Sequence, residues 1–287
     1  MKRNSIQTGS SSVNRNILRL AVPNIVSNIV IPMLGMIDTA IAGHIGADVN
    51  IAALAIGATI FNFIYWNCAF VRMGTSGMTA QAFGAGNMRE CANMLLRSLW
   101  LALAIVVLLL TLQQPVGRFS LYIMHGSETV SRLAGEYFFA RIWAVPASIA
   151  LFAVHGWFIG MQDAKTPMIV SIISVITNAL FSLVFVYCFD MGIKGIAWGT
   201  VVAQYVGLVM SVALWLRKYR HLLGFFDIRE SLKLRPLLQF MNVNKDVFLR
   251  TFCVVIVYTF FTSISARFGD TVLATNALLM QLFTLFS

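Results

Sequence analysis

The sequence predicts an all-α polytopic membrane protein, and three observations lead to that prediction. The 287 residues have a mean hydropathy of +0.80. Only 11% of them are charged and 59% are hydrophobic, whereas a soluble domain carries about 25% charged residues. Apolar segments long enough to cross the hydrocarbon core, which takes about 20 residues, recur along the chain. This composition excludes an ordinary cytosolic enzyme, a disordered protein and a disulfide-rich secreted module.

The apolar segments are expected to form about eight transmembrane helices. They cover roughly residues 18–43, 51–72, 94–112, 137–161, 167–189, 193–216, 247–267 and 271–287. Each segment is continuous, without the alternation of polar and apolar residues that is typical of barrel strands in outer membranes. The second segment is expected to continue as an amphipathic helix towards Gly84. Gly74, Gly77 and Ala80 keep small residues on one face there, and small residues let neighbouring helices approach closely.

The distribution of Lys and Arg predicts how the chain is oriented. Sixteen of the 21 basic residues fall at the N-terminus and in the loops on its side of the membrane, and four fall on the opposite side. Basic loops stay in the cytoplasm, so we expect a cytoplasmic N-terminus and a multi-pass location in the plasma (inner) membrane. The net charge of +10 then faces the anionic inner leaflet of the lipid bilayer. No nucleic-acid partner is needed to explain it.

The chain is expected to divide into two unequal parts. Residues 1–216 hold six helices and form an N-terminal lobe, residues 217–245 form a basic cytoplasmic linker, and residues 246–287 begin a second lobe. Two short stretches of the first lobe recur weakly after the linker. Six helices per unit would place both units the same way up, as a parallel repeat. Because the sequence stops inside an apolar segment, we expect a C-terminally incomplete chain, a piece of a longer protein or a truncated reading frame.

Among the eleven acidic residues, only Asp38 falls well inside a predicted span. A carboxylate there costs about 2.5–3.5 kcal/mol on insertion scales, so an acid inside the membrane indicates function. A carboxyl group withdrawn from water can exchange a proton for a cation. The alternative is that the first helix ends early and Asp38 lies at the outer interface. Pro23, fifteen residues earlier, removes a backbone hydrogen bond and is a candidate hinge.

Four stretches resemble one transporter family. They are residues 35–46 (GMIDTAIAGHIG), residues 74–87 (GTSGMTAQAFGAGN), residues 160–167 (GMQDAKTP), and a region from Asn178 through GIAWGT at 195–200 to Gln204. Together they are similar to the multidrug and toxic compound extrusion (MATE) transporters. The aspartate and proline of the first helix indicate the DNA-damage-inducible (DinF-like) branch. The resemblance implies twelve helices in two six-helix lobes around a central cleft in the complete protein.

The resemblance also implies a polar cluster for ion coupling and substrate binding in the N-terminal lobe. By matching positions, its members are Asp38, Tyr137, Asn178 and Thr200, with Ser182 and His155 nearby. Tyr137 could equally be an aromatic residue of the outer interface. Asn178 and Thr200 could form ordinary hydrogen bonds between helices. His155 could add a second titratable group or could form a structural hydrogen bond between helices.

The coupling ion follows less directly from these positions. Sodium could bind at Asp38, Asn178 and Thr200, since hard cations are bound by oxygen atoms. Many relatives carry a second acid where this chain has Ser182, one helical turn after Asn178 and on the same face. A single carboxylate weakens a sodium site and favours coupling to protons. No cofactor is expected besides the H⁺ or Na⁺ that would be exchanged.

The sequence therefore predicts a secondary active efflux antiporter rather than an enzyme. Its cargo would be small organic cations or amphipathic drugs, moved in exchange for protons or sodium, and its state is expected to be monomeric. A flippase for lipid-linked oligosaccharides is an alternative of the same superfamily. That cargo has an anionic pyrophosphate, and Arg141 near the outer edge is the main basic residue of the membrane interior that could meet it. A truncated chain that transports nothing is a third reading.

Overall fold

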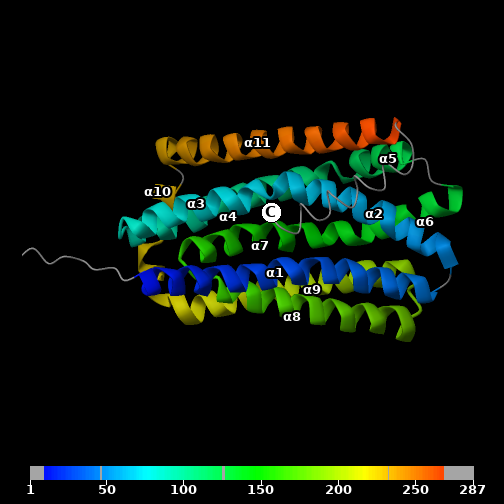
Figure 1. Cartoon of the computed structure of the whole chain (residues 1–287), viewed down its shortest axis with the longest axis horizontal. Coiled ribbons are helices and arrows are strands. Elements are labelled where there is room, and N and C mark those ends of the chain that lie inside the picture. The colour runs from blue at the N-terminus through cyan, green and yellow to red at the C-terminus, as the bar shows by residue number, and fades with distance from the viewer. Residues whose placement is uncertain (1–9, 46, 125–126, 232, 268–287) are drawn as a thin grey trace, which may run out of the picture.

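The computed structural model describes residues 10–45, 47–124, 127–231 and 233–267. These residues form helices that lie lengthwise beside one another, with α7 through the middle (Figure 1). The α-helices are α1 (Ser10–Ile45), α2 (Ala47–Cys68), α3 (Phe70–Gly84), α4 (Met88–Thr111), α5 (Gln113–Ile123), α6 (Glu128–Arg141), α7 (Val145–Gly160), α8 (Lys165–Leu183), α9 (Ile193–Tyr219), α10 (Ile228–Ser231) and α11 (Leu234–Arg267). The short helices are η1 (Ile142–Ala144), η2 (Val184–Cys188) and η3 (Arg220–Phe225). No strand occurs in the described ranges, which confirms the all-α prediction.

Five stretches of the described chain are long and apolar enough to cross a membrane. They are Val49–Gly84, Met88–Thr111, Glu128–Gly160, Lys165–Cys188 and Ile193–Phe225. A shorter apolar stretch, Met33–Ile45, forms the second part of α1. These stretches match the second to sixth predicted segments and part of the first, and α3 continues the second segment to Gly84 as expected. Residues 271–287, the eighth predicted segment, lie outside the described residues.

Local sequence signals set the helix boundaries. Helix α4 begins after Asn87, whose side chain accepts a hydrogen bond from the backbone NH of Glu90 at 3.0 Å. Ser127 caps α6 in the same way, as short polar side chains commonly do at helix starts. Gly192 precedes α9 with φ +55°, a backbone conformation that glycine adopts without strain.

Glycines on α7 bring this helix into backbone contact with α3. A Cβ atom at Gly156 would lie 2.5 Å from the backbone oxygen of Arg72, and one at Gly160 would lie 2.6 Å from the Cβ of Thr79. Gly74 is one of the small residues predicted on α3. There the side chain of Asn244 from α11 occupies the space that a Cβ atom would need. Helix α11 therefore packs on α3, along the edge of the bundle in Figure 1.

The stretch predicted as a linker, residues 217–245, is largely helical. It contains η3 and α10, and α11 begins at Leu234 rather than after Lys245. Arg97 of α4, only 1% exposed, ties this region to the bundle. Its Nη1 pairs with Glu90 at 2.5 Å and its Nε donates to the backbone oxygen of Ser231 at 3.3 Å. The charged residues of this stretch make its composition polar, but they do not prevent it from forming helices.

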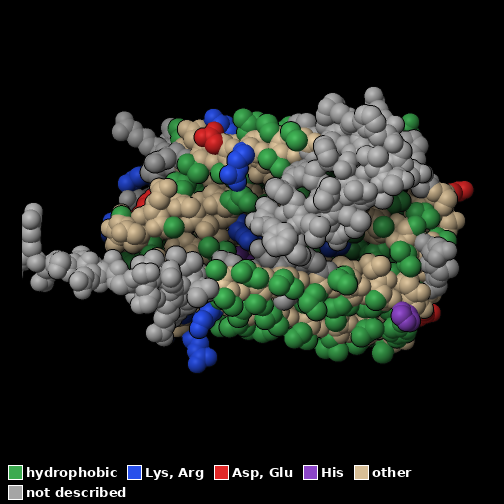
Figure 2. All heavy atoms as spheres, in the orientation of Figure 1, with side chains coloured by type: hydrophobic (Ala, Val, Ile, Leu, Met, Phe, Trp, Pro, Cys, Tyr) green, Lys and Arg blue, Asp and Glu red, His purple; other side chains and the backbone are tan. Residues whose placement is uncertain are grey.

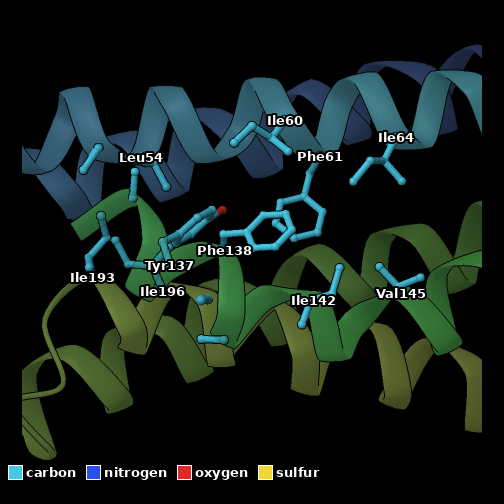
Figure 3. Packing of buried hydrophobic residues seen from close by; sticks show 14 of the residues in the cluster. Leu54, Ile60, Phe61, Ile64, Tyr137, Phe138, Ile142, Val145, Ile193 and Ile196 are labelled. Carbon is cyan, nitrogen blue, oxygen red and sulfur yellow. The ribbon is translucent and has the colours of Figure 1, made fainter. Parts of the chain in front are cut away.

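The largest buried apolar cluster joins α1, α2, α4, α6, α7 and α9. Figure 3 shows its centre, where Phe61 and Ile64 of α2 face Phe138, Ile142 and Val145. The rings of Phe61 and Phe138 stack with centroids 5.3 Å apart. The apolar surface seen in Figure 2 extends along the lower helices of the bundle, as lipid-facing sides of transmembrane helices require.

Candidate functional site

Asp38 lies on the inner face of α1, seven residues before the helix ends. Its residue is 3% exposed, while its neighbours Met36 and Thr39 are exposed. Helix α1 packs chiefly against α8 and also against α2. The carboxyl group therefore points into the helix bundle, and α1 continues beyond it to Ile45 rather than ending early.

Asn178 of α8 and Thr200 of α9 form the polar partners of Asp38. Both side chains are buried. With the amide nitrogen of Asn178 towards α1, it donates to Asp38 Oδ1 at 3.2 Å, and the amide oxygen accepts from the Thr200 hydroxyl at 3.1 Å and from its backbone NH at 3.3 Å. This orientation satisfies both ends of the amide and provides a donor to an ionised carboxylate.

The opposite orientation of the same amide would require a protonated Asp38. The amide nitrogen then donates to Thr200 Oγ1 at 3.1 Å, and the threonine hydroxyl donates to the backbone oxygen of Ile196 at 3.2 Å. The amide oxygen now faces Asp38, and only a carboxyl that carries a proton can donate to it. That orientation also turns the amide nitrogen towards the backbone NH of Thr200, and two donors cannot bond each other, so the contacts favour the orientation in which Asn178 donates to Asp38.

Tyr137 and Arg141 form the other side of the cluster, one turn apart on α6. Tyr137 is completely buried, and its hydroxyl accepts a hydrogen bond from Arg141 Nη1. The guanidinium carbon of Arg141 lies 5.0 Å from the ring centroid of Phe61 and 5.4 Å from that of Tyr137. Figure 3 shows Tyr137 pointing from α6 towards α2, beside Phe61.

Arg141, predicted near the outer edge of its span, is buried among the helices at 9% exposure. A cation–π pair with two rings accounts for part of its stabilisation. The sequence did contain a signal, because Arg141 follows Tyr137 by four residues and therefore shares its helix face. An arginine one helical turn from a residue assigned to the cluster belongs to the same side of the helix.

The remaining predicted residues occupy different positions. Ser182 is completely buried one turn after Asn178, packed against Gly199 of α9, and its hydroxyl has no hydrogen-bond partner in the described part of the chain. His155 lies on α7, which packs against α3, and its Nε2 is buried without a hydrogen-bond partner in the described part of the chain. Pro23 is buried within α1, which continues as a helix on both sides of it.

A second polar cluster is centred on Asp163, which lies outside the spans in the loop between α7 and α8. Asp163 Oδ2 accepts from Thr166 Oγ1 at 2.6 Å and from Lys218 Nζ at 2.7 Å. Burial opposes ionisation of Asp163, but these hydrogen bonds outweigh it and hold the pKa of the carboxyl below its usual range. The cluster fastens the end of α9 to the start of α8. Asp163 and Thr166 of the GMQDAKTP stretch therefore have a structural role.

Metal-binding side chains do not gather in the described residues, where no group of three or more His, Cys, Asp or Glu occurs. The three residues predicted to bind sodium do come together. Asp38 offers two carboxylate oxygens and Thr200 one hydroxyl oxygen, while Asn178 turns its amide nitrogen to Asp38 and its amide oxygen to Thr200. Only one of these groups carries a charge.

Comparisons with known proteins agree with this arrangement. The MatE family model matches residues 23–184. The chain is 35% identical to DNA damage-inducible protein F of Escherichia coli over 277 residues, which are 96% of this chain and 60% of that protein. It is 28% identical to a probable multidrug resistance protein NorM of Synechocystis over 253 residues, 85% of this chain and 53% of that one.

A solved structure supports the fold. The structure of MATE in the bent conformation superposes with a TM-score of 0.81 at 22% identity, covering 92% of this chain and 59% of the other. The chain thus spans about 60% of the length of these relatives. The members of the matched family are multi-pass membrane transporters and not enzymes. The family model and the DinF relative together show that this chain belongs to the MatE family.

Proposed function

We propose that the protein is a secondary active efflux antiporter in which Asp38 is the coupling group. It exports amphipathic drugs, organic cations among them, in exchange for protons or sodium ions. The single observation that carries this proposal is an ionisable carboxyl, 3% exposed, hydrogen-bonded to Asn178 inside a transmembrane bundle. Multidrug resistance relatives support the cargo class.

The mechanism rests on linkage between two binding events. An ion at Asp38 and a drug in the adjoining cleft favour different conformations, so each biases the equilibrium that the other requires. Thr200 donates to the amide oxygen of Asn178 and so holds the amide nitrogen towards Asp38, where it donates to the carboxylate. Tyr137 orients the basic side of the cluster through Arg141. Pro23 weakens the backbone of α1 and would act as its hinge.

The proposal also includes the setting of the protein. The N-terminus lies in the cytoplasm, as the excess of basic residues on its side indicates, and the membrane is the inner membrane. The first six spans form one lobe and α11 begins the second. The whole transporter acts as a monomer, since coupling at Asp38 uses residues of the first lobe alone.

A flippase for lipid-linked oligosaccharides fits the described spans less well. A pyrophosphate headgroup requires several basic groups that are free to bind it. The two arginines buried in the described spans are already engaged, Arg97 with Glu90 and Arg141 with Tyr137. Because both arginines are engaged, these spans fit amphipathic compounds better than an anionic headgroup.

The test is drug efflux by the protein expressed from its complete gene, reconstituted in vesicles with separately imposed proton and sodium gradients. Asp38→Asn keeps the shape of the side chain and removes its charge, so gradient-driven efflux should fall to the background rate while the protein still inserts. Asp190→Asn is the matched control. Asp190 is an exposed acid at the end of η2 with φ +50°, which asparagine also adopts. Efflux at the wild-type rate by Asp38→Asn would refute the proposal.

A further inference from the structure

A hollow of about 370 Å³ lies at the end of the bundle that holds α10 in Figure 1. One wall is Arg89 of α4, and the other is residues 224–228, which run from the end of η3 into α10. Arg89 is the second residue of the membrane-crossing stretch Met88–Thr111, and Phe225 is the last residue of the stretch Ile193–Phe225. The hollow therefore lies where two spans leave the hydrocarbon core and meet the lipid headgroups. Its volume is typical of a small-molecule site, about 300–1,000 Å³.

Buried contacts hold the second wall of the hollow in place. Leu222 of η3 is completely buried. The ring of Phe226 packs edge-on against that of Trp215, with centroids 5.4 Å apart. At the other end of the wall, the backbone oxygen of Ser231 accepts a hydrogen bond from the buried Arg97 of α4 at 3.3 Å. Because the wall is anchored on both sides, the hollow belongs to the packed fold.

The rim of the hollow exposes large apolar side chains. Phe225 and Ile228 line it and are 41% and 60% exposed, and Leu223 beside them is 47% exposed. Clustered apolar side chains on a surface mark a site of contact with a protein or a membrane. Because Phe225 ends a membrane-crossing stretch, the acyl chains of the surrounding leaflet are the apolar partner within reach.

Two exposed side chains of opposite charge also line the hollow, Arg89 and Asp227. A guanidinium binds phosphate through several N–H groups, and a carboxylate accepts hydrogen bonds from an ammonium group. A purely anionic headgroup would meet the carboxylate as well as the guanidinium. A zwitterionic headgroup that contains a phosphate and a primary ammonium matches both. The trimethylammonium of phosphatidylcholine has no N–H to donate, whereas the ammonium of phosphatidylethanolamine has three.

We propose that this hollow binds the headgroup of one phosphatidylethanolamine molecule of the surrounding leaflet. Arg89 binds the phosphate, Asp227 accepts from the ammonium group, and the acyl chains lie along Phe225 and Ile228. The bound lipid bridges the start of α4 and the segment that leads through α10 into α11. The proposal is independent of the coupling role of Asp38, so either can fail without the other.

The experiment titrates the purified protein, expressed from its complete gene, with three phospholipids that have identical acyl chains, and native mass spectrometry counts the bound molecules. Phosphatidylethanolamine should bind about tenfold more tightly than phosphatidylcholine or phosphatidylglycerol, since it alone matches both charged groups. Asp227→Asn keeps the shape of the side chain and should remove most of the advantage over phosphatidylcholine. Arg89→Gln should weaken the binding of both lipids by a similar factor, because both contain the phosphate.

The exposed ion pair of Lys245 and Asp246, 3.8 Å apart on α11, provides matched controls. These residues do not line the hollow, so Lys245→Gln and Asp246→Asn should leave lipid binding unchanged. Wild type that binds phosphatidylcholine or phosphatidylglycerol as tightly as phosphatidylethanolamine would overturn the inference, and this result needs no variant. The preference persisting in Asp227→Asn would also overturn it. Free phosphoethanolamine, which has no acyl chains, should not displace the lipid at equal concentration, and displacement would assign the hollow to a soluble ligand instead.

Discussion

The contact between α8 and α9 at Gly199 predicts a sharp effect of one added methyl group. A Cβ atom at Gly199 would lie 2.7 Å from the backbone nitrogen and 2.8 Å from the Cα of Ser182. Both atoms belong to the backbone of α8, so a side-chain rotation cannot relieve the contact. Gly199→Ala should therefore move the two helices apart and destabilise the protein by about 1–3 kcal/mol, as overpacking typically does.

The same shift should disturb the coupling cluster, because Thr200 follows Gly199 directly. The hydrogen bond between Asn178 and Thr200 is 3.1 Å long. A separation of about 0.5 Å would lengthen it beyond the range of a real hydrogen bond. We expect Gly199→Ala to lower the midpoint of thermal unfolding and to reduce coupled efflux more than its loss of stability explains. Both are measured on the purified protein, in detergent and in vesicles.

Two variants control the interpretation. Gly77→Ala on α3 meets no atom within 4 Å, so it should be neutral or slightly stabilising, since alanine favours helix by up to about 1 kcal/mol over glycine. Ser182→Ala removes the hydroxyl that also lies against Gly199 but leaves the backbone contacts. Combined with Gly199→Ala it should restore only part of the stability. Full recovery in that double variant would show that the backbone contact does not limit the approach of the helices.

Two further predictions concern the polar contacts at the ends of the helices. Lys218 and Thr166 hold the pKa of Asp163 below its usual value. The ionised form of Asp163 therefore stabilises the protein above about pH 4. This stabilisation is lost as the pH falls through the lowered pKa. Asp163→Asn should flatten the acid side of the curve of unfolding temperature against pH, and an unchanged curve would contradict the assigned contacts. Arg97→Met should leave Glu90 and the oxygen of Ser231 without their donor, at a cost of about 1–3 kcal/mol. Amide hydrogen exchange in α10 should then become faster, and unchanged exchange would show that Arg97 does not hold α10.

The sequence predicted the helical spans and the core of the cluster well, because both depend on local patterns. Long apolar runs have one structural solution in a bilayer, and Asp38 stood out as a charge inside such a run. The prediction that Asn178 and Thr200 lie together came from the resemblance to the family. Their distance, and the choice between two amide orientations, depends on how closely α8 and α9 approach.

The rest of the prediction was limited because the sequence does not fix how each helix is oriented about its own axis. An apolar span has polar residues on faces that the sequence alone does not assign to lipid or to a neighbour. Arg141 is an example, since it donates to the hydroxyl of Tyr137 inside the bundle. The helical start of α11 at Leu234 was missed for another reason: its first turns are polar, and a basic composition is compatible with a loop or an exposed helix.

The two sides of the cluster are fixed more firmly than the carboxyl between them. Gly199 holds α9 against α8, and Gly57 of α2 leaves space for the ring of Tyr137, where a Cβ atom would lie 2.8 Å from the ring carbon Cε1. Asn178 and Arg141 are therefore positioned by closely packed helix pairs. Asp38 belongs to α1, which packs against both pairs and contains Pro23. A change in the partner of Asp38 would therefore arise most readily from movement of α1.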